Sequence, residues 1–244
     1  MFPVAILAGG LATRLRPITE SIPKALIDVA GQPFIHRQLR YLSGQGVTSV
    51  VVCTGYLGQQ IEAAVGDGSA FGLLVRYSYD GPTLLGTGGA LRRALPRLGA
   101  NFFVLYGDSF LPCDFNKVQA SFTASGQPAL MTVLNNAGQW DKSNVLFRDR
   151  RIVEYNKRTP RVDMRHVDYG LGVLSADILA GNPDGGAFDL SDVYHQLSLA
   201  GKLAGHEVYH RFYEIGSHEG LKEAEAYFST DELSAEQPAT KENT

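Results

Sequence analysis

The sequence predicts an α/β fold built on a Rossmann-like, doubly wound sheet that is mixed but mostly parallel. Patterns of buried strands and amphipathic helices alternate through the first half of the chain, as expected where helices connect parallel strands. The first strand, at residues 4–7, is apolar at every position, which is typical of a strand covered on both faces. Hydrophobic residues make up 44% of the 244 residues and charged residues 19%, so the chain can bury a large core.

Hydrophobic spacing justifies each element of the first half in order. After the strand at 4–7, the residues Phe34, Ile35, Leu39 and Leu42 recur at helical spacing, which predicts a helix at 34–44. The same criteria then predict, in order, a strand at 47–54, a helix at 56–65, a strand at 73–79, a helix at 90–98 and a strand at 101–106.

The second half is interpreted as an extension of the sheet and a lid built onto the first half. We expect helices at 190–200 and 217–228, the latter with Ser217 as N-cap, and a turn at 148–152. Strands are expected at 129–134, 144–147, 152–155 and 167–174. Because neither a linker nor an internal repeat is visible, we predict one domain at 1–228, made of halves at 1–115 and 116–228. Residues 229–244 are polar and are expected to form a loose tail.

Composition argues against several kinds of partner. The formal net charge is −3, which disfavours nucleic acid, and no apolar run is long enough to span a membrane. Cys53 and Cys113 lack metal-binding spacing. Together with the absence of a targeting segment, this indicates a reduced cytoplasmic protein. The oligomeric state is left open, a homo-oligomer included.

A glycine turn follows the first strand and precedes two spaced cations. Glycines let backbone N–H groups approach phosphate oxygens, and a guanidinium and an ammonium supply the opposite charge. The segment is neither a Walker A loop nor a G-x-G-x-x-G motif, but it predicts a cradle for a polyanion. The residues concerned are Leu7, Ala8, Gly9 and Gly10 in the turn, followed by Arg14 and Lys24.

A second group of small residues lies between a strand and a helix. Gly86, Thr87, Gly88 and Gly89 would let a flat base lie against the main chain. Asp108 follows the fourth strand and offers a carboxylate, a hard oxygen ligand suited to Mg²⁺. Because ligands bind at the carboxyl ends of the strands in such sheets, both glycine segments and Asp108 predict one site.

Three segments of the first half resemble the signature of the sugar-1-phosphate nucleotidylyltransferases: LAGGLATRLRP at 7–17, IPKALIDVAGQPFI at 22–35 and LGTGGAL at 85–91. The resemblance implies an enzyme that converts an NTP and a sugar-1-phosphate to an NDP-sugar and pyrophosphate, with Mg²⁺ as cofactor. It assigns residues 1–115 to the nucleotide and 116–228 to the sugar. The Gly-Thr-Gly-Gly form is most similar to guanylyltransferases that act on mannose- or heptose-1-phosphate, so GTP is favoured.

The resemblance also implies roles for individual residues. Arg14 and Lys24 correspond to the catalytic cations of the family, and Asp108 to its metal-binding aspartate. Glu214 stands where the family has a second aspartate of the metal site. Its extra methylene group displaces the carboxylate. Glu214 could therefore bind the metal directly, bind it through a water molecule, or bind a sugar hydroxyl instead.

The segments that would contact the sugar depart from the pattern of the family. Lys157 matches the lysine that holds the sugar-1-phosphate, but Asn156 and Arg158 differ from the usual Glu-Lys-Pro sequence. Asp168 and Gly170 lie where the family has Asn-x-Gly. The asparagine amide can donate hydrogen bonds, whereas the carboxylate of Asp168 can only accept them. The reaction is therefore better determined than the sugar.

Other interpretations of the chain remain open. One is a UTP- or CTP-using nucleotidyltransferase that acts on another phosphorylated substrate, and another is a regulatory homologue that binds nucleotide sugars without catalysis. Trp140, in a polar loop, is expected either to cover the sugar or simply to pack against the protein.

Overall fold

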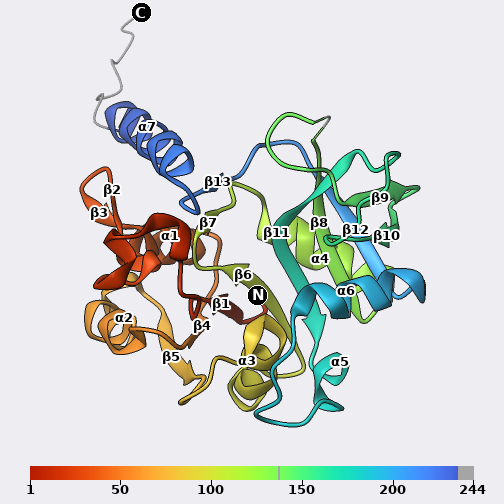
Figure 1. Cartoon of the computed structure of the whole chain (residues 1–244), viewed down its shortest axis with the longest axis horizontal. Coiled ribbons are helices and arrows are strands. Elements are labelled where there is room, and N and C mark those ends of the chain that lie inside the picture. Colours follow the sequence, from red (N-terminus) through yellow and green to blue (C-terminus); the bar gives the residue numbers. More distant parts are fainter. Residues whose placement is uncertain (137, 236–244) are drawn as a thin grey trace, which may run out of the picture.

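A mixed sheet runs through the centre of the molecule (Figure 1). The structure is a computed structural model that describes residues 1–136 and 138–235, and the side chains of 1–136 and 138–230. In these residues nine strands pair in the spatial order β5 (Leu74–Tyr79), β4 (Ser49–Thr54), β1 (Val4–Leu7), β6 (Asn101–Tyr106), β11 (His166–Ser175), β8 (Ala129–Asn135), β12 (Leu203–Val208), β10 (Arg151–Tyr155) and β9 (Val145–Arg148).

The four strands of the first half are parallel. β1 lies between β4 and β6, with Val4 opposite Val50 on one side and opposite Phe103 on the other. The chain adds β4 and β5 on one side of β1 and then crosses to β6 on the other side. The strand order therefore reverses between β1 and β6, and ligands bind at such switch points in α/β sheets.

Strand β11 connects the two halves within the same sheet. It runs antiparallel to both β6 and β8, and β12 then pairs in parallel with β8. The remaining strands β10 and β9 are antiparallel, and β9 returns to β11, where Val145 lies opposite His166. The α/β architecture predicted from the sequence is confirmed.

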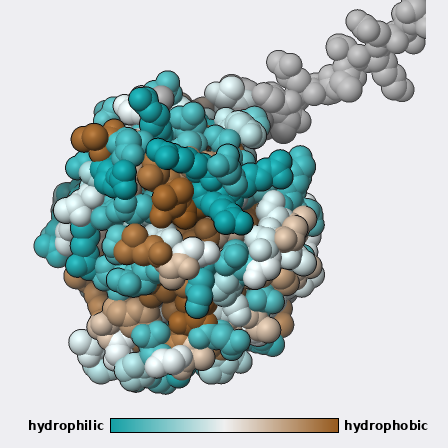
Figure 2. All heavy atoms as spheres, turned by 90° about the vertical axis from the view of Figure 1, so that its right-hand side faces the viewer, coloured by the Kyte–Doolittle hydropathy of each residue, from teal (hydrophilic) through white to brown (hydrophobic). Residues whose placement is uncertain are grey.

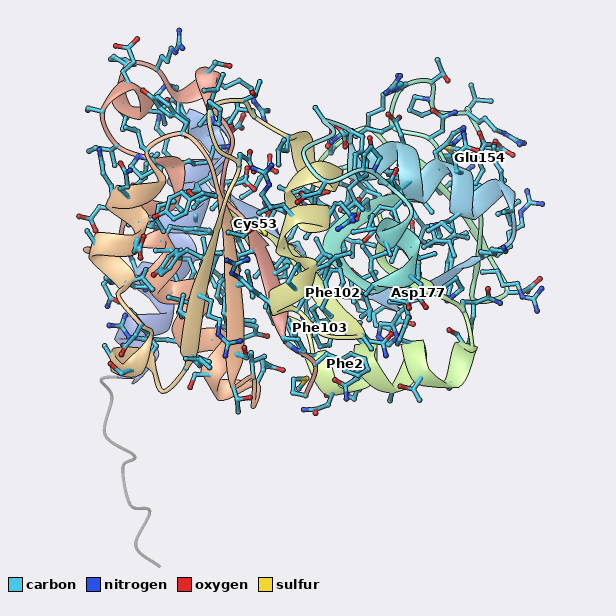
Figure 3. All side chains as sticks on the ribbon, turned by 90° about the horizontal axis from the view of Figure 1, so that it is seen from below. Phe2, Cys53, Phe102, Phe103, Glu154 and Asp177 are labelled. Carbon is cyan, nitrogen blue, oxygen red and sulfur yellow. The ribbon has the colours of Figure 1, made fainter. Side chains whose placement is uncertain are left out.

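Helices cover both faces of the sheet. Because side chains alternate along a strand, Phe102 and Phe103 of β6 enter opposite hydrophobic cores (Figure 3). The core that contains Phe103 also contains side chains of α1 (Phe34–Gly44), α2 (Gly58–Val65) and α4 (Phe115–Ser125). The core that contains Phe102 is closed by α3 (Gly86–Ala94), α5 (Asp177–Ala180) and α6 (Leu190–Leu199).

A third, smaller core anchors the C-terminal helix α7 (His218–Ala235). Phe228 of α7 packs edge-on against Phe34 and Phe110, with ring centres 6.5 and 4.8 Å apart. As predicted, Ser217 caps the helix, because its Oγ accepts a hydrogen bond from the N–H of Gly220 at 3.1 Å. Two small sheets lie beside this core: β13 (Tyr213–Glu214) with β7 (Ser109–Phe110), and β2 (Asp28–Val29) with β3 (Gln32–Pro33).

Several predicted boundaries and elements were wrong. The helix expected at 90–98 begins at Gly86, so the second glycine segment forms its first turn and not a loop. Helix α4 and strand β12 were not predicted, although Asp114 caps α4 by accepting from the N–H of Lys117 at 3.1 Å. The tail expected at 229–244 is helical as far as Ala235, and the rest of it lies outside the described residues.

Short 3₁₀ turns also occur at η1 (Thr13–Leu15), η2 (Ile18–Glu20), η3 (Lys24–Leu26), η4 (Ser69–Phe71) and η5 (Leu95–Arg97).

The face formed by the second half is mainly hydrophilic, with apolar side chains in small groups (Figure 2). Among the described helices, none combines the length and the apolar character that crossing a membrane requires.

Candidate active site

A cavity opens at the carboxyl ends of β1, β4 and β6, where the strand order reverses. Its volume is about 240 Å³. Six of the eight residues predicted to bind the nucleotide line it: Leu7, Ala8, Gly9, Gly10, Gly86 and Thr87. Lys24 and Asp108 belong to the same wall. The structure thus brings both glycine segments, one predicted cation and the predicted metal ligand to one hollow.

Close approach between main chains shapes the first glycine segment. The N–H of Ala8 donates to the carbonyl of Cys53 at 2.8 Å, which continues the β1–β4 ladder beyond the strand. A Cβ atom at Gly9 would lie 3.0 Å from the backbone nitrogen of Gly55. The absence of a side chain at Gly9 therefore lets the turn pass over β4 and present its backbone to the cavity.

The glycines of the second segment allow close packing against residues 186–188. A Cβ at Gly88 would lie 2.3 Å from the ring of Phe188, and one at Gly89 would lie 2.4 Å from the carbonyl oxygen of Gly186. The Phe188 carbonyl also accepts hydrogen bonds from the N–H groups of Gly88 at 3.0 Å and Gly89 at 3.4 Å. A Cβ at Gly86 would likewise lie 2.6 Å from the Phe188 carbonyl oxygen, so the segment at 186–188 requires all three glycines. Gly86 and Thr87 in addition line the cavity.

Thr87 links the cavity wall to the start of α6. Its hydroxyl donates to Asp189 Oδ1 at 2.9 Å and accepts from the N–H of Leu190 at 2.8 Å. Burial alone would raise the pKa of Asp189, but hydrogen bonds from Ser191 and Thr87 hold that pKa below its ordinary value. Asp189 therefore remains a carboxylate and, through Thr87, ties the start of α6 to the cavity wall.

Four predicted residues from distant parts of the chain, between positions 14 and 214, form one charged cluster. Lys24 Nζ lies 2.8 Å from Asp108 Oδ2, and their side chains are only 16% and 26% exposed. An Arg14 guanidinium nitrogen and Glu214 Oε1 would lie 3.3 and 3.5 Å from a Cβ at Gly216, so both side chains face this glycine. Arg14 and Lys24 both lower the pKa of Glu214, and of these two cations the cavity lining includes Lys24 and not Arg14.

Pairing of the short strands β13 and β7 carries Glu214 to this cluster. Glu214 is opposite Ser109 in the pairing, and the N–H of Ile215 donates to the carbonyl of Asp108 at 2.9 Å. Withdrawal from water and then the nearby Asp108 carboxylate raise the pKa of Glu214, while Arg14 lowers it. The Asp108 carboxylate is thus close enough to Glu214 to raise its pKa.

The two carboxylates fit the needs of Mg²⁺. This ion is commonly held by one or two carboxylates, with phosphate oxygens and water completing an octahedron. No group of three or more potential ligands occurs in the residues that the structure describes. Asp108 Oδ2 bonds Lys24, and Oδ1 accepts from the Ser109 hydroxyl at 3.2 Å.

Of the residues predicted to bind the sugar, Asp168 and Gly170 are joined by a hydrogen bond, and Lys157 is near enough for its charge to act on Asp168. Gly170 has φ +100°, and its N–H donates to Asp168 Oδ1 at 3.0 Å. Burial raises the pKa of Asp168 to about 6, while the Gly170 N–H and the charge of Lys157 oppose the rise. Lys157 also lowers the pKa of Asp189. The charge of Lys157 therefore acts on two carboxylates, Asp168 and the Asp189 that bonds Thr87.

Sequence reasoning missed Asp80. This aspartate lines the cavity, is 5% exposed, and accepts the N–H of Leu85 on Oδ2 at 3.2 Å. Burial raises its pKa, while the hydrogen bond from Leu85 and the charge of Arg93 oppose the rise. Its place directly after a strand, at the carboxyl edge of a parallel sheet, was a signal that could have identified it.

Trp140 lies in the middle of the connection between β8 and β9. Its side chain is 40% exposed, and the Arg211 guanidinium carbon lies 5.8 Å from the centre of its ring. The next residue, Asp141, contributes to raising the pKa of Glu214. Trp140 therefore packs on Arg211 and leaves part of its ring exposed.

Comparisons with known proteins agree on one family. Residues 4–142 match the family model described as nucleotidyl transferase. An N-acetylmuramate alpha-1-phosphate uridylyltransferase of Neisseria meningitidis is 34% identical over 230 residues, which cover 91% of this chain and 96% of the relative. A D-glycero-alpha-D-manno-heptose 1-phosphate guanylyltransferase of Aneurinibacillus thermoaerophilus is 30% identical over 158 residues, covering 63% and 66%.

A solved structure shows the same fold. HddC from Yersinia pseudotuberculosis, complexed with GMP-PN, superposes with a TM-score of 0.79 at 24% identity and covers 93% of this chain and 100% of that one.

Proposed function

Since this chain belongs to the nucleotidyl transferase family and is a sugar-1-phosphate nucleotidyltransferase, we propose that GTP is its nucleotide donor. The observation that carries this proposal is the carboxylate of Asp80 in the wall of the cavity. Guanine presents adjacent N1–H and N2–H₂ donors, whereas uracil presents a single N–H between two carbonyl oxygens. A carboxylate only accepts hydrogen bonds, so Asp80 matches guanine and repels the carbonyl groups of uracil.

UTP is the second candidate. The Neisseria relative that is matched over 96% of its length is named as a uridylyltransferase, and the matched guanylyltransferase is covered over 66%. Two sources of support therefore point to different bases, and the choice between them is experimental.

The reaction needs positioning and countercharge more than acid–base catalysis. An oxygen of the sugar phosphate attacks the α-phosphorus of the NTP, and the bond to pyrophosphate breaks on the opposite side. The second pKa of a phosphate monoester is about 6, so the attacking oxygen is already anionic at neutral pH. Two unit charges ~4 Å apart repel by about 4 kcal/mol at an effective dielectric near 20, and here several such charges must meet.

The charged cluster supplies the groups that offset this repulsion. We assign Arg14 to the departing pyrophosphate and Lys24 to the α-phosphate, where negative charge accumulates during transfer. Asp108 and Glu214 would hold Mg²⁺. When bound there, the ion would neutralise phosphate charge and help to align the triphosphate.

The sugar side completes the proposal. Lys157 would bind the phosphate of the sugar-1-phosphate, and Asp168 would accept hydrogen bonds from sugar hydroxyl groups beside Gly170. Cys53 and Cys113 are both free, which supports the proposal that the enzyme works in the cytoplasm, where thiols stay reduced.

Nucleotide choice is tested by measuring pyrophosphate release with four NTPs, each combined with glucose-, mannose-, heptose- and N-acetylmuramate-1-phosphate. We expect the highest kcat/KM with GTP. In Asp80→Asn, which keeps an acceptor for Leu85, we expect kcat/KM for GTP to fall by about 10- to 100-fold, the size of one base-reading contact, while the value for UTP rises or stays level. Wild-type enzyme that prefers UTP would replace the guanylyl assignment by the uridylyl one.

For Lys157→Ala we expect KM for the sugar-1-phosphate to rise by about tenfold or more, because a charge-assisted hydrogen bond contributes roughly 1.5–3 kcal/mol. The value of kcat should change much less. The matched control is Arg158→Ala, since the neighbouring Arg158 side chain is 74% exposed and pairs with Asp192 at 2.6 Å. Equal KM values in Lys157→Ala and the wild type would place Lys157 outside the sugar site.

A further inference from the structure

A buried glutamine of α1 holds the turn that carries Asp108. Gln38 is 2% exposed. Its Nε2 donates to the carbonyl of Tyr106 at 2.9 Å and to the carbonyl of Ser109 at 2.8 Å. These carbonyls belong to the residues that flank the Gly107-Asp108 turn between β6 and β7. One side chain, 70 positions earlier in the sequence, therefore bridges both ends of this turn.

Two further hydrogen bonds hold the turn from other directions. The N–H of Gly107 donates to the carbonyl of Leu7 at 2.9 Å, and the carbonyl of Asp108 accepts from Ile215 at 2.9 Å. The backbone of the turn is thus fixed by β1, by the residue after β13 and by α1. Gln38 is the member of this set that acts through its side chain, so it can be changed without altering the main chain.

The chemistry at this position selects a glutamine. A neutral NH₂ group offers two donors on one nitrogen, which matches two converging carbonyl oxygens. The remaining atom, Oε1, is buried, and no partner for it occurs in the described residues. A buried acceptor without a partner destabilises a protein, and this cost offsets part of what the hydrogen bonds to Tyr106 and Ser109 contribute. The distinctive consequence of the glutamine is therefore the bridge that it makes across the turn.

We propose that Gln38 is a positioning residue for the transfer reaction, which keeps the Asp108 carboxylate at its place beside Lys24. This inference rests on the role proposed for Asp108. Displacement of a reacting group by about 1 Å can lower a rate by roughly 100-fold, and Asp108 Oδ2 lies 2.8 Å from Lys24 Nζ. Loss of the bridge allows the turn to shift on this scale without unfolding the sheet below it.

The test is Gln38→Met, which keeps the length of the side chain and removes both donors together with the unpaired oxygen. We expect kcat to fall by about 10- to 100-fold, with KM for the sugar-1-phosphate within about twofold of the wild type. Hydrogen exchange gives a second readout that does not depend on turnover. The amides of 106–110 and of Ile215 should exchange faster in the variant, and those of α6 should not change.

The matched control is Gln45→Met at the end of the same helix. Gln45 also bonds the main chain through its amide, because its Oε1 accepts from the N–H of Phe115 at 3.1 Å, but it does not touch the Asp108 turn. This variant should show wild-type kcat and unchanged exchange at 106–110.

A double-variant cycle separates positioning from a general loss of stability. If Gln38 acts through Asp108, Gln38→Met lowers kcat in the wild type but not further in the Asp108→Asn background. An equal further loss in that background, or wild-type kcat in Gln38→Met, overturns the inference. If Asp108→Asn by itself leaves kcat unchanged, the role proposed for Asp108 fails instead.

Discussion

Replacing Lys24 with alanine is expected to lower kcat by about two to three orders of magnitude, the usual loss for one preorganised charge contact. Lys24 lies in the cavity wall, with its Nζ 2.8 Å from Asp108 and its side chain 16% exposed. At this depth an ammonium interacts strongly with a phosphate group. No other lysine lines the cavity in the described residues, so no second ammonium group in this wall could replace that of Lys24.

The size of this effect distinguishes catalysis from folding. A partly exposed ion pair contributes about 1 kcal/mol or less to stability, so the midpoint of thermal unfolding should move by only a few degrees. The control is Lys117→Ala. Lys117 is 76% exposed and also pairs with an aspartate, Asp114, at 3.5 Å, but the pair lies at the start of α4. We expect it to leave kcat unchanged.

Single-turnover measurements with a saturating NTP and sugar-1-phosphate would show that the loss in Lys24→Ala lies in the chemical step. Turnover within about threefold of the wild type would remove Lys24 from the catalytic assignment, since that ratio is far below the loss of a charge contact.

The sequence was sufficient to predict the parts of the fold that depend on local patterns. The strand at Val4–Leu7 and the helix at Phe34–Gly44 were predicted with their observed bounds, because their hydrophobic spacing is regular. Strand β12 was missed because Leu203–Val208 contains Gly205, His206 and Glu207, and these residues interrupt the apolar pattern that predicts a buried strand. Gly205 is needed there because a Cβ would lie 2.4 Å from the ring of Phe147, a contact made only in the folded chain.

Similar limits apply to the site. Arg14, Lys24 and Asp108 follow strands or turns whose positions could be predicted, and parallel strands bring their ends to one edge. The reason for Gly88 could not be predicted, since it is the ring of Phe188, 100 positions later, that excludes a side chain. Gln38 could not be identified either. Within a helix a glutamine is ordinary, and its two acceptor partners become neighbours only after β6 and β7 have formed.

The second large effect is expected for Asp108→Asn, which should lower kcat by about two to three orders of magnitude. Asparagine has nearly the same shape and can still accept a hydrogen bond from Lys24, so the change removes charge and little else. The expected loss follows from the proposed metal site. A neutral amide is a much weaker ligand for Mg²⁺ than a carboxylate, and Glu214 alone would then provide the anionic ligand of the protein.

The measurement is kcat as a function of Mg²⁺ concentration, with calorimetric titration of Mg²⁺ into the complex with a non-hydrolysable NTP as an independent readout. In Asp108→Asn the concentration for half-maximal activity should rise, and calorimetry should show weaker binding. Asp114→Asn is the matched control, because Asp114 also pairs with a lysine but caps α4. Because asparagine caps a helix about as well as aspartate and the pair with Lys117 is exposed, this variant should keep both the stability and the response to Mg²⁺ of the wild type. If Asp108→Asn and the wild type responded to Mg²⁺ in the same way, the Asp108 carboxylate would not be a metal ligand. Its role would then be to orient Lys24, and the positive charge of that lysine would be the main contribution of this wall to catalysis.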